Sequence, residues 1–321
     1  MAGVLRAEQE HPVGPRGPAW VLGASGLLGS AVVRRLRAAG REVVTTAVPW
    51  TDPAAAVEAL VQAAAALPAD LAETYWCAGA GVVGSSEEQL RDEVAVLEEL
   101  LRRWESPRRH SLFLASSAGG VYAGSTGAPF TEAALPVPLA EYGRAKLRSE
   151  EVARAFAERT GSTLLVGRLS NLYGPGQDIA KPQGLISQLC RAQLTRQPLS
   201  VYVSLDTMRD YLFVEDGADM VVTGLGAVSA RGGTHLKILA SEHSTTIGAV
   251  LGELRRVTRH RPPVVLGSSP NARFQVHDLR LRSLVWPPLS GLGRTTLAAG
   301  ISSTLAAVRV QLLPSGPHRV G

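Results

Sequence analysis

The chain has 321 residues, 45% of them hydrophobic, which is enough to bury a sizeable core in one large domain or in two lobes. No apolar run approaches the roughly 18 residues of a membrane span, and the two cysteines, Cys77 and Cys190, exclude a disulfide framework and suit a reducing cytoplasm. The formal charge of +5 comes from arginines scattered along the chain rather than from a basic stripe, so we expect no nucleic-acid, membrane or metal partner.

The first half of the chain alternates short apolar runs with helical patterns. Strands are predicted at Ala19–Leu22, Glu42–Thr46, Thr74–Cys77, Ser111–Ala115 and Thr163–Arg168. A first helix is predicted to end at Gly40, and later helices are predicted at Pro53–Leu67, Glu87–Trp104 and Glu141–Thr160. Strands that alternate with helices predict an α/β fold with a doubly wound parallel sheet of the Rossmann type, covered by helices on both faces.

The pattern becomes irregular after Asn171, with many glycines and prolines between isolated helices. These helices are predicted near Gly184–Arg196, Val214–Gly226 and Thr246–Arg259. We therefore expect a flexible N-terminal tail over 1–18, a Rossmann domain over 19–175, and a smaller substrate-binding lobe over 176–312 with some elements returning to the main sheet. Residues 313–321 are expected to form a second tail.

A glycine-rich segment joins the first predicted strand to the first predicted helix with the spacing Gly-x-x-Gly-x-x-Gly. The first glycine permits a tight turn, the second lets backbone amides approach a pyrophosphate, and the third lets the helix pack close to the strand. Backbone amides at the helix N-terminus then meet the phosphates. The segment therefore predicts dinucleotide binding, with contacts from Gly23, Ser25, Gly26, Leu27, Leu28 and Gly29.

The end of the second predicted strand bears on which dinucleotide is bound. An acidic residue there would hydrogen-bond the adenosine ribose of NAD, but this strand ends at Thr46 without an acid. A threonine hydroxyl can bind a 2′-phosphate, and three arginines are near in sequence: Arg34, Arg35 and Arg41. The sequence therefore favours NADP slightly over NAD. Asp52 either contacts the adenine or caps the helix that begins at Pro53, and the two roles are compatible.

Tyr142 and Lys146 lie one helical turn apart in the sequence Tyr-Gly-Arg-Ala-Lys, on the same face of a predicted helix. An ammonium that close favours the phenolate, because opposite charges stabilise each other. A tyrosine tuned in this way can exchange a proton with a hydroxyl or carbonyl near neutral pH. The pair is a candidate general acid and base, although the same spacing also occurs on helices without a catalytic role.

Six segments in order give the chain a resemblance to the extended short-chain dehydrogenase/reductase family. They are the glycine loop, Cys77-Ala-Gly-Ala-Gly81, Ala115-Ser-Ser-Ala-Gly-Gly-Val-Tyr122, the Tyr-x-x-x-Lys pair, Arg168-Leu-Ser-Asn-Leu-Tyr-Gly-Pro-Gly176 and Arg209-Asp-Tyr-Leu-Phe-Val-Glu-Asp216. The pattern is most similar to the nucleotide-sugar epimerases, dehydratases and 4-ketoreductases. It covers the chain from Ala19 to about Val308.

The resemblance implies a role for each of these segments. Besides the glycine loop, Thr46 and Asp52, the resemblance implies five further cofactor contacts: Ala78, Gly79, Tyr142, Lys146 and Ser170. Asn171 and Arg209 would hold the diphosphate of a nucleotide sugar, a ligand that suits a bidentate guanidinium. Tyr142 would be the general acid or base at the reacting oxygen of the sugar, and Lys146 would assist it while binding the nicotinamide ribose.

The segment from Ala115 to Tyr122, called the serine loop below, departs from the family pattern at two places. The family uses a hydroxyl there to bind the reacting oxygen of the substrate, and counting from the two flanking motifs places this hydroxyl either at Ala118 or at Ser117. We assign the catalytic and substrate-binding hydroxyl to Ser117. The Asp-Glu pair of the 4,6-dehydratases is replaced by Gly119 and Gly120, which argues against dehydration.

The sequence thus predicts an NAD(P)-dependent enzyme acting on a nucleotide-diphosphate sugar, either a 4-ketoreductase or a 4-epimerase. Two alternatives remain open at this point. A non-catalytic NAD(P)-binding sensor or scaffold is compatible with the missing hydroxyl at Ala118, since a fold does not by itself imply a function. A reductase of a ketone without a nucleotide is the other.

The helix over Glu141–Thr160 bears on oligomeric state. Relatives often pair two such helices across a four-helix dimer interface, and Leu147, Val152 and Phe156 give this helix apolar positions. The resemblance therefore favours a homodimer over a helix that packs only on its own sheet.

Overall fold

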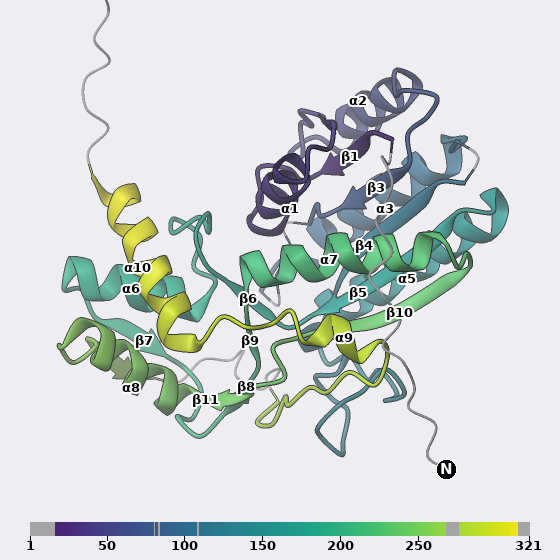
Figure 1. The fold of residues 1–321 in the computed structure, drawn as a ribbon. Coiled ribbons are helices and arrows are strands. Elements are labelled where there is room, and N and C mark those ends of the chain that lie inside the picture. Colours follow the sequence, from purple (N-terminus) through teal and green to yellow (C-terminus); the bar gives the residue numbers. More distant parts are fainter. Residues whose placement is uncertain (1–16, 80, 83, 108, 268–275, 314–321) are drawn as a thin grey trace, which may run out of the picture.

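The computed structural model of the chain describes residues 17–79, 81–82, 84–107, 109–267 and 276–313. The central strands are β1 (Ala19–Leu22), β2 (Val43–Thr45), β3 (Glu73–Trp76), β4 (Ser111–Ser117), β5 (Thr163–Leu169) and β10 (Thr234–Leu239). They form one parallel sheet in the order β10-β5-β4-β3-β1-β2 (Figure 1). The parallel sheet with helices on both faces confirms the predicted Rossmann-type fold.

Each face of the sheet buries its own apolar core. Helices α1 (Leu27–Ala38) and α7 (Val214–Ser229) cover one face, and α2 (Pro53–Ala65), α3 (Glu87–Arg103) and α5 (Glu141–Thr160) cover the other. Strand β1 shows why two cores form. Val21 packs into the first core while Trp20 and Leu22 pack into the second, because successive side chains of a strand point to opposite faces.

Strand β10 is a part of the main sheet that the sequence did not predict. It pairs with β5, and α7 packs on α1, so both elements belong to the main body although they follow the first elements of the small lobe. Its apolar run is interrupted by Lys237, which is fully buried. The Lys237 ammonium donates hydrogen bonds to the Ser283 hydroxyl at 2.7 Å and to the Val285 carbonyl at 2.5 Å. These distant partners, which come from another segment, make a lysine tolerable in a core strand.

The small lobe packs three helices, α6 (Leu185–Thr195), α8 (Ile247–Thr258) and α10 (Leu297–Leu312), of which α10 was also not predicted. Two-stranded pairs accompany these helices: β6 (Asn171–Tyr173) with β9 (Tyr211–Phe213), β7 (Leu199–Val201) with β12 (Val264–Leu266), and β8 (Met208–Arg209) with β11 (Thr245–Thr246). A further short helix, α9 (Pro287–Ser290), packs against α7. Within the described residues, no helix is both long and apolar enough to cross a membrane.

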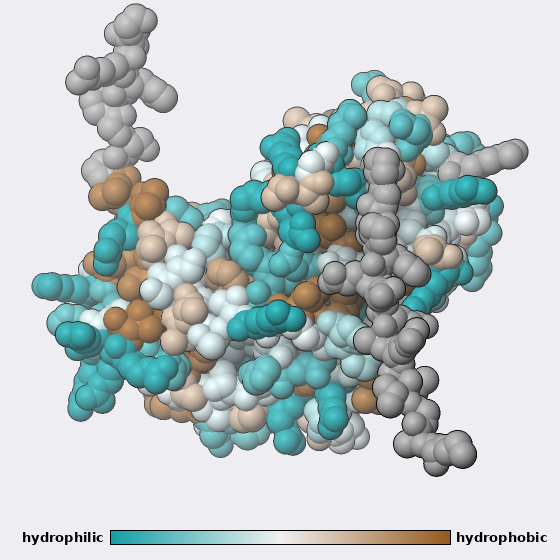
Figure 2. Space-filling view, viewed as in Figure 1, coloured by the Kyte–Doolittle hydropathy of each residue, from teal (hydrophilic) through white to brown (hydrophobic). Residues whose placement is uncertain are grey.

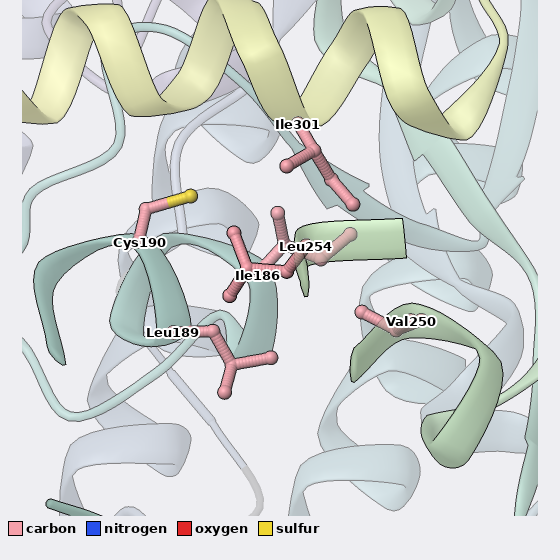
Figure 3. Close-up of a pocket in the computed structure, with 6 residues that line it drawn as sticks. All are labelled: Ile186, Leu189, Cys190, Val250, Leu254 and Ile301. Carbon is pink, nitrogen blue, oxygen red and sulfur yellow. The ribbon is translucent and has the colours of Figure 1, made fainter. Parts of the chain in front are cut away.

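Apolar side chains converge between the three helices of the small lobe (Figure 3). The lining residues are Ile186, Leu189, Cys190, Val250, Leu254 and Ile301. The gap between them is too tight to admit a water molecule, so it is interhelical packing and not a ligand site. Further apolar side chains are exposed at the end of α10 (Figure 2), namely Val310, Leu312 and Leu313.

The outer face of α3 and α5 is charged rather than apolar. Val152 and Phe156 pack into the core beneath α5, and Leu147 packs against a cluster around Ala118. On the outer side, Arg148 and Glu98 form an ion pair at 3.5 Å, with 57% and 50% of their side chains exposed. The apolar residues that favoured a dimer are therefore used within the subunit, and the homodimer stays a prediction.

A buried ion pair ties helix α5 to the sheet. Glu150 on α5 is fully buried and accepts two hydrogen bonds from Arg168 on β5, at 2.9 and 2.8 Å. The Ser116 hydroxyl on β4 donates to the same carboxylate at 2.6 Å, and Arg168 also donates to the Tyr122 hydroxyl at 2.8 Å. Burial alone would raise the pKa of Glu150, but its hydrogen bonds and the charge of Arg168 lower that pKa overall.

We expect Glu150→Gln to lower the free energy of unfolding by about 3–5 kcal/mol, because the substitution leaves the buried Arg168 guanidinium without its counter-charge. Urea denaturation measures this. Glu151→Gln on the same helix is the matched control: its side chain is 64% exposed, and we expect a change within about 0.5 kcal/mol. Equal effects of the two substitutions would contradict the role given to Glu150.

A second buried polar residue links β4 to the neighbouring strand and loop. His110 is 1% exposed, and its ring nitrogens contact the Thr74 hydroxyl at 2.9 Å and the Ser162 hydroxyl at 3.3 Å. Burial lowers the pKa of His110 to about 3, so the folded protein holds a neutral ring where an unfolded chain would be protonated below its ordinary pKa of 6.5.

Because the unfolded state binds this extra proton, the contribution of His110 to stability is present above pH ~6.5 and is lost as the pH falls towards about 3. We expect the free energy of unfolding to fall by up to about 1.4 kcal/mol per pH unit below pH ~6 on this account. In His110→Gln that part of the slope disappears. Urea denaturation at several pH values between about 7 and 5 would show it, and parallel slopes for the two proteins would count against it.

Candidate active site

The predicted site residues meet at the carboxyl ends of the central strands. In the sheet order, β2 lies on one side of β1 and β3 lies on the other, so the connections leave β1 and β3 in opposite directions. Ligands of open α/β sheets bind in the crevice that such a switch point opens. The glycine loop follows β1, and the segment of Ala78 and Gly79 follows β3.

The backbone of the glycine loop requires glycine at two positions. Gly23 has a φ of +77°, and a β-carbon there would lie 2.6 Å from the amide nitrogen of Ala78. A β-carbon at Gly29 would lie 2.1 Å from the carbonyl oxygen of Gly23, so helix α1 packs directly on the loop. No side chain in the described structure caps α1 at Gly26, and both Ser25 and Gly26 are exposed. The uncapped amides form a cradle that fits a pyrophosphate.

Residues after β2 bear on whether NAD or NADP is bound. The Thr46 hydroxyl accepts a hydrogen bond from the Trp20 indole at 2.9 Å. Asp52 caps α2 by accepting from the amide of Ala55 at 3.0 Å, which confirms the capping interpretation of this residue.

The three arginines that favoured NADP each have a carboxylate partner. Arg34 pairs with Glu215 at 2.6 Å, and Arg35 pairs with Asp219. Arg41 pairs with Glu73 at 2.9 Å, where its side chain is only 11% exposed. Each of these guanidinium groups already has an anionic partner, so the geometry adds no support to the NADP preference.

Helix α5 brings Tyr142 and Lys146 together as their spacing predicts. The Lys146 ammonium lies 5.6 Å from the centre of the Tyr142 ring, and Lys146 is 8% exposed. It donates a hydrogen bond to Glu93 on α3 at 2.9 Å. Burial disfavours the ammonium, but Tyr142 and Glu93 outweigh it and raise the pKa of Lys146 above its ordinary value.

Glu93 is the residue of this site that sequence reasoning missed. Its carboxylate accepts hydrogen bonds from Lys146 and, at 3.0 Å, from the amide of Gly81. A signal was present in the sequence, because Glu93 lies between Leu90 and Leu97 on the buried face of the amphipathic helix α3. A charged residue on such a face needs a partner, and here the partner is Lys146.

The two serines and the alanine at the start of the serine loop make different contacts in the structure. Ser117 caps the short helix α4 (Ala118–Val121) by accepting from the amide of Gly120 at 3.1 Å, which leaves its own hydrogen free to donate. Ser116 instead donates to the buried Glu150. Ala118 is fully buried in an apolar cluster and supplies no hydroxyl.

Two glycines set the distance between α4 and the tyrosine. A β-carbon at Gly120 would lie 2.8 Å from Cε1 of Tyr142. A β-carbon at Gly143 would lie 2.2 Å from the carbonyl oxygen of Gly120. The tyrosine ring therefore rests directly on the backbone of the serine loop, and a side chain at position 120 would displace it.

Asn171 and Ser170 contact Asp210 at the junction with the small lobe, while the Arg209 guanidinium donates to the carbonyl of Met208 at 2.8 Å. The Asn171 side-chain amide donates to the carbonyl of Asp210 at 2.9 Å, and β6 pairs with β9 directly beyond it. Asp210 is fully buried and accepts from the amide and hydroxyl of Ser241 at 2.9 and 3.0 Å. Burial raises the pKa of Asp210, while Ser170 and Ser241 oppose the rise. Arg209 is 9% exposed, and burial lowers its pKa.

Neither cysteine is placed as a nucleophile. Burial raises the pKa of the Cys77 thiol well above its ordinary value, and it raises that of Cys190 to about 12. Cys77 packs against the core beneath α1 and α7. Among the residues that the structure describes, no three histidine, cysteine, aspartate or glutamate side chains are grouped as metal ligands.

Comparison with known families decides the assignment. The sequence model described as "NAD dependent epimerase/dehydratase family" matches residues 19–238. The chain belongs to this family. The match runs from the strand before the glycine loop to β10, so it includes Tyr142, Lys146 and the serine loop.

Individual relatives carry several activities. The dTDP-4-dehydro-6-deoxyglucose reductase of Escherichia coli is 32% identical over 105 residues, 33% of each chain. A dTDP-glucose 4,6-dehydratase of Neisseria gonorrhoeae is 29% identical over 240 residues, 66% of this chain and 68% of the relative. The chain spans only a quarter to a half of the length of the first curated relatives that it matches.

Solved structures share the fold over nearly the whole chain. MoeE5 in complex with UDP-glucuronic acid and NAD is 24% identical, with a TM-score of 0.77 over 92% of this chain and 100% of MoeE5. The UDP-glucose 4-epimerase of Thermotoga maritima is 19% identical, with a TM-score of 0.76 over 92% of this chain and 100% of that enzyme. At these identities the likeness establishes the fold.

The contact between the serine loop and Tyr142 gives a direct test. We expect Gly120→Ala to lower the free energy of unfolding by about 1–3 kcal/mol, because the new methyl group overlaps the tyrosine ring. Gly119→Ala is the matched control, since a β-carbon there would meet its nearest neighbour, Leu279, at an ordinary 3.5 Å. Chemical denaturation of both variants checks this, and a neutral Gly120→Ala would show that the ring does not rest on the loop.

Proposed function

We propose that this protein is an NAD(P)-dependent enzyme that acts at the 4-position of a nucleotide-diphosphate sugar, as a 4-ketoreductase or a 4-epimerase. The observation that carries the proposal is the pair of Tyr142 and the buried Lys146, beside the serine loop and the glycine cradle on one edge of the sheet. The chain's family membership and its similarity to a sugar reductase and to a dTDP-L-rhamnose 4-epimerase support it.

The residues present fit a nicotinamide dinucleotide. Gly23, Gly26 and Gly29 would hold the pyrophosphate against the uncapped amides of α1, and Lys146 would hold the nicotinamide ribose. The bound nicotinamide would supply or accept the hydride at the sugar carbon. We propose NAD or NADP as the cofactor, and the preference for NADP stays a prediction that depends on Thr46.

Tyr142 would exchange the proton at the reacting oxygen. In reduction, the phenol O–H bond breaks, the proton forms the new hydroxyl of the sugar, and the phenolate then recovers a proton from water. Ser117 would donate its hydroxyl hydrogen to the same oxygen, since the amide of Gly120 occupies one of its lone pairs and not its hydrogen. Asn171 and Arg209 would hold the diphosphate.

The contact at Gly120 favours these two reactions over 4,6-dehydration. Several of the relatives are dTDP-glucose 4,6-dehydratases. Enzymes of that kind carry a glutamate at the place of Gly120, whereas here any β-carbon at 120 would lie 2.8 Å from the Tyr142 ring. Without a carboxylate at 119 or 120, this loop has no group to assist the elimination of water.

The test uses dTDP-4-dehydro-6-deoxyglucose with NADH and, separately, NADPH. A reductase oxidises the reduced cofactor stoichiometrically. We expect Tyr142→Phe to lower kcat by about 10²–10⁴, and Ser117→Ala by about 10–100, because each loses a group that acts on the reacting oxygen. Cofactor affinity, measured by calorimetry, should stay within about threefold of the wild type in both.

Tyr202→Phe is the control, because this tyrosine is 48% exposed in the small lobe. Interconversion of C4 epimers with a retained cofactor and no net oxidation would select the epimerase. Cofactor binding that persists with no turnover of any nucleotide sugar, together with an unaffected Tyr142→Phe, would favour the sensor or scaffold.

A further inference from the structure

A carboxylate from outside the catalytic helix reaches the Tyr142–Lys146 pair. Glu93 on α3 accepts from the Lys146 ammonium at 2.9 Å and from the amide of Gly81 at 3.0 Å. The side chains of Lys146 and Glu93 are only 10% and 20% exposed. With so little water around it, this ion pair is weakly screened, and its effect on neighbouring groups is larger than that of a surface pair.

Gly79 fits closely over the same ion pair. Its φ is +149°, and a β-carbon there would lie 2.8 Å from Oε1 of Glu93 and 3.0 Å from Nζ of Lys146. The backbone after β3 therefore closes on both charged groups, and only a glycine leaves room for them. The segment that the family uses to line the cofactor is, in this chain, also a wall of the ion pair.

Two groups act electrostatically on Lys146 in the described structure: Tyr142 on its own helix and Glu93 on α3. Ser117, on the neighbouring strand, carries no charge. The lysine would act alone on the phenol if Glu93 were absent, and its positive charge would draw the tyrosine towards the phenolate. The Glu93 carboxylate, 2.9 Å from the ammonium, offsets part of that field, because its negative charge lies close to the positive one.

We propose that Glu93 is a positioning residue that fixes the Lys146 ammonium and offsets part of its charge, so that the site favours reduction of a ketone. The inference rests on the proposed function and chooses between its two versions. A phenol has a proton to give to a carbonyl oxygen, whereas oxidation of a hydroxyl, with which 4-epimerisation begins, needs a base.

The first test measures Lys146 without any substrate or cofactor. The chain has three lysines, Lys146, Lys181 and Lys237, so ¹⁵N-labelled lysine gives an ammonium spectrum that single Lys→Arg variants can assign. Removal of the negative charge in Glu93→Gln makes loss of the Lys146 proton easier. We expect its NMR titration to move to lower pH by about one unit.

The matched control is Glu98→Gln, on the same helix but on its outer face, where the side chain is 50% exposed and pairs with Arg148. It should leave the Lys146 titration unchanged. Glu93→Asp keeps the charge and should stay near the wild type. If the Glu93→Gln variant does not fold, the Lys146 titration of Glu93→Asp tests the contact instead. A titration like that of the wild type shows that the shorter carboxylate still pairs with Lys146, and a titration at lower pH shows that the contact is lost.

The second test follows the pH dependence of kcat for ketone reduction. A reaction that needs the phenol slows as the pH rises through the ionisation of the site. In Glu93→Gln the uncompensated lysine favours the phenolate, so we expect the slowing to begin about one pH unit lower. A merely structural role of Glu93 would lower kcat equally at all pH values.

The two tests separate the possible failures. An unchanged Lys146 titration and an unchanged pH profile in Glu93→Gln overturn the role of Glu93. If the Lys146 titration shifts in Glu93→Gln but the wild-type protein reduces no nucleotide keto-sugar, the proposed reductase is overturned, while the ion pair keeps its effect on the lysine. Faster epimerisation than reduction in the wild type would contradict the direction that we infer.

Discussion

The geometry of the candidate site depends on how helix α5 is held against the sheet. The fully buried pair of Glu150 and Arg168 joins the middle of this helix to β5, and Ser116 joins the same carboxylate to β4. Two charges buried in this way are stable only with near-complete hydrogen bonding, so the helix has little freedom to slide. Tyr142 lies eight residues earlier on the same helix, so the ion pair also fixes the position of Tyr142.

Backbone contacts then bring the tyrosine to its neighbours. Gly120 and Gly143 allow α4 and α5 to approach until the ring rests on the serine loop. Gly23 and Gly29 do the same for the glycine loop and α1, and Gly79 does so for the segment after β3. In each case the missing β-carbon allows two segments of the site to come within contact distance.

Helix α5 carries two partly or fully buried carboxylate contacts. Glu150 pairs with Arg168 at 2.8 Å and with Arg154 at 2.9 Å. Nearer to Tyr142 on the same helix, Lys146 pairs with Glu93 of α3 at 2.9 Å. This last pair connects the packing of α3 and α5 with the proton transfer that we propose.

The sequence by itself determined the fold class, most of the helices and the Tyr142–Lys146 spacing, because these depend on local patterns: apolar runs, a helical period of 3.6 residues and glycines at fixed intervals. It did not predict β10, whose buried Lys237 is tolerated only through partners about fifty residues away. Nor did it assign Glu93, the ion pairs of Arg34, Arg35 and Arg41, or the packing of Gly120 on Tyr142. Only the tertiary structure decided these, because each depends on which side chains from distant segments come within a few ångströms.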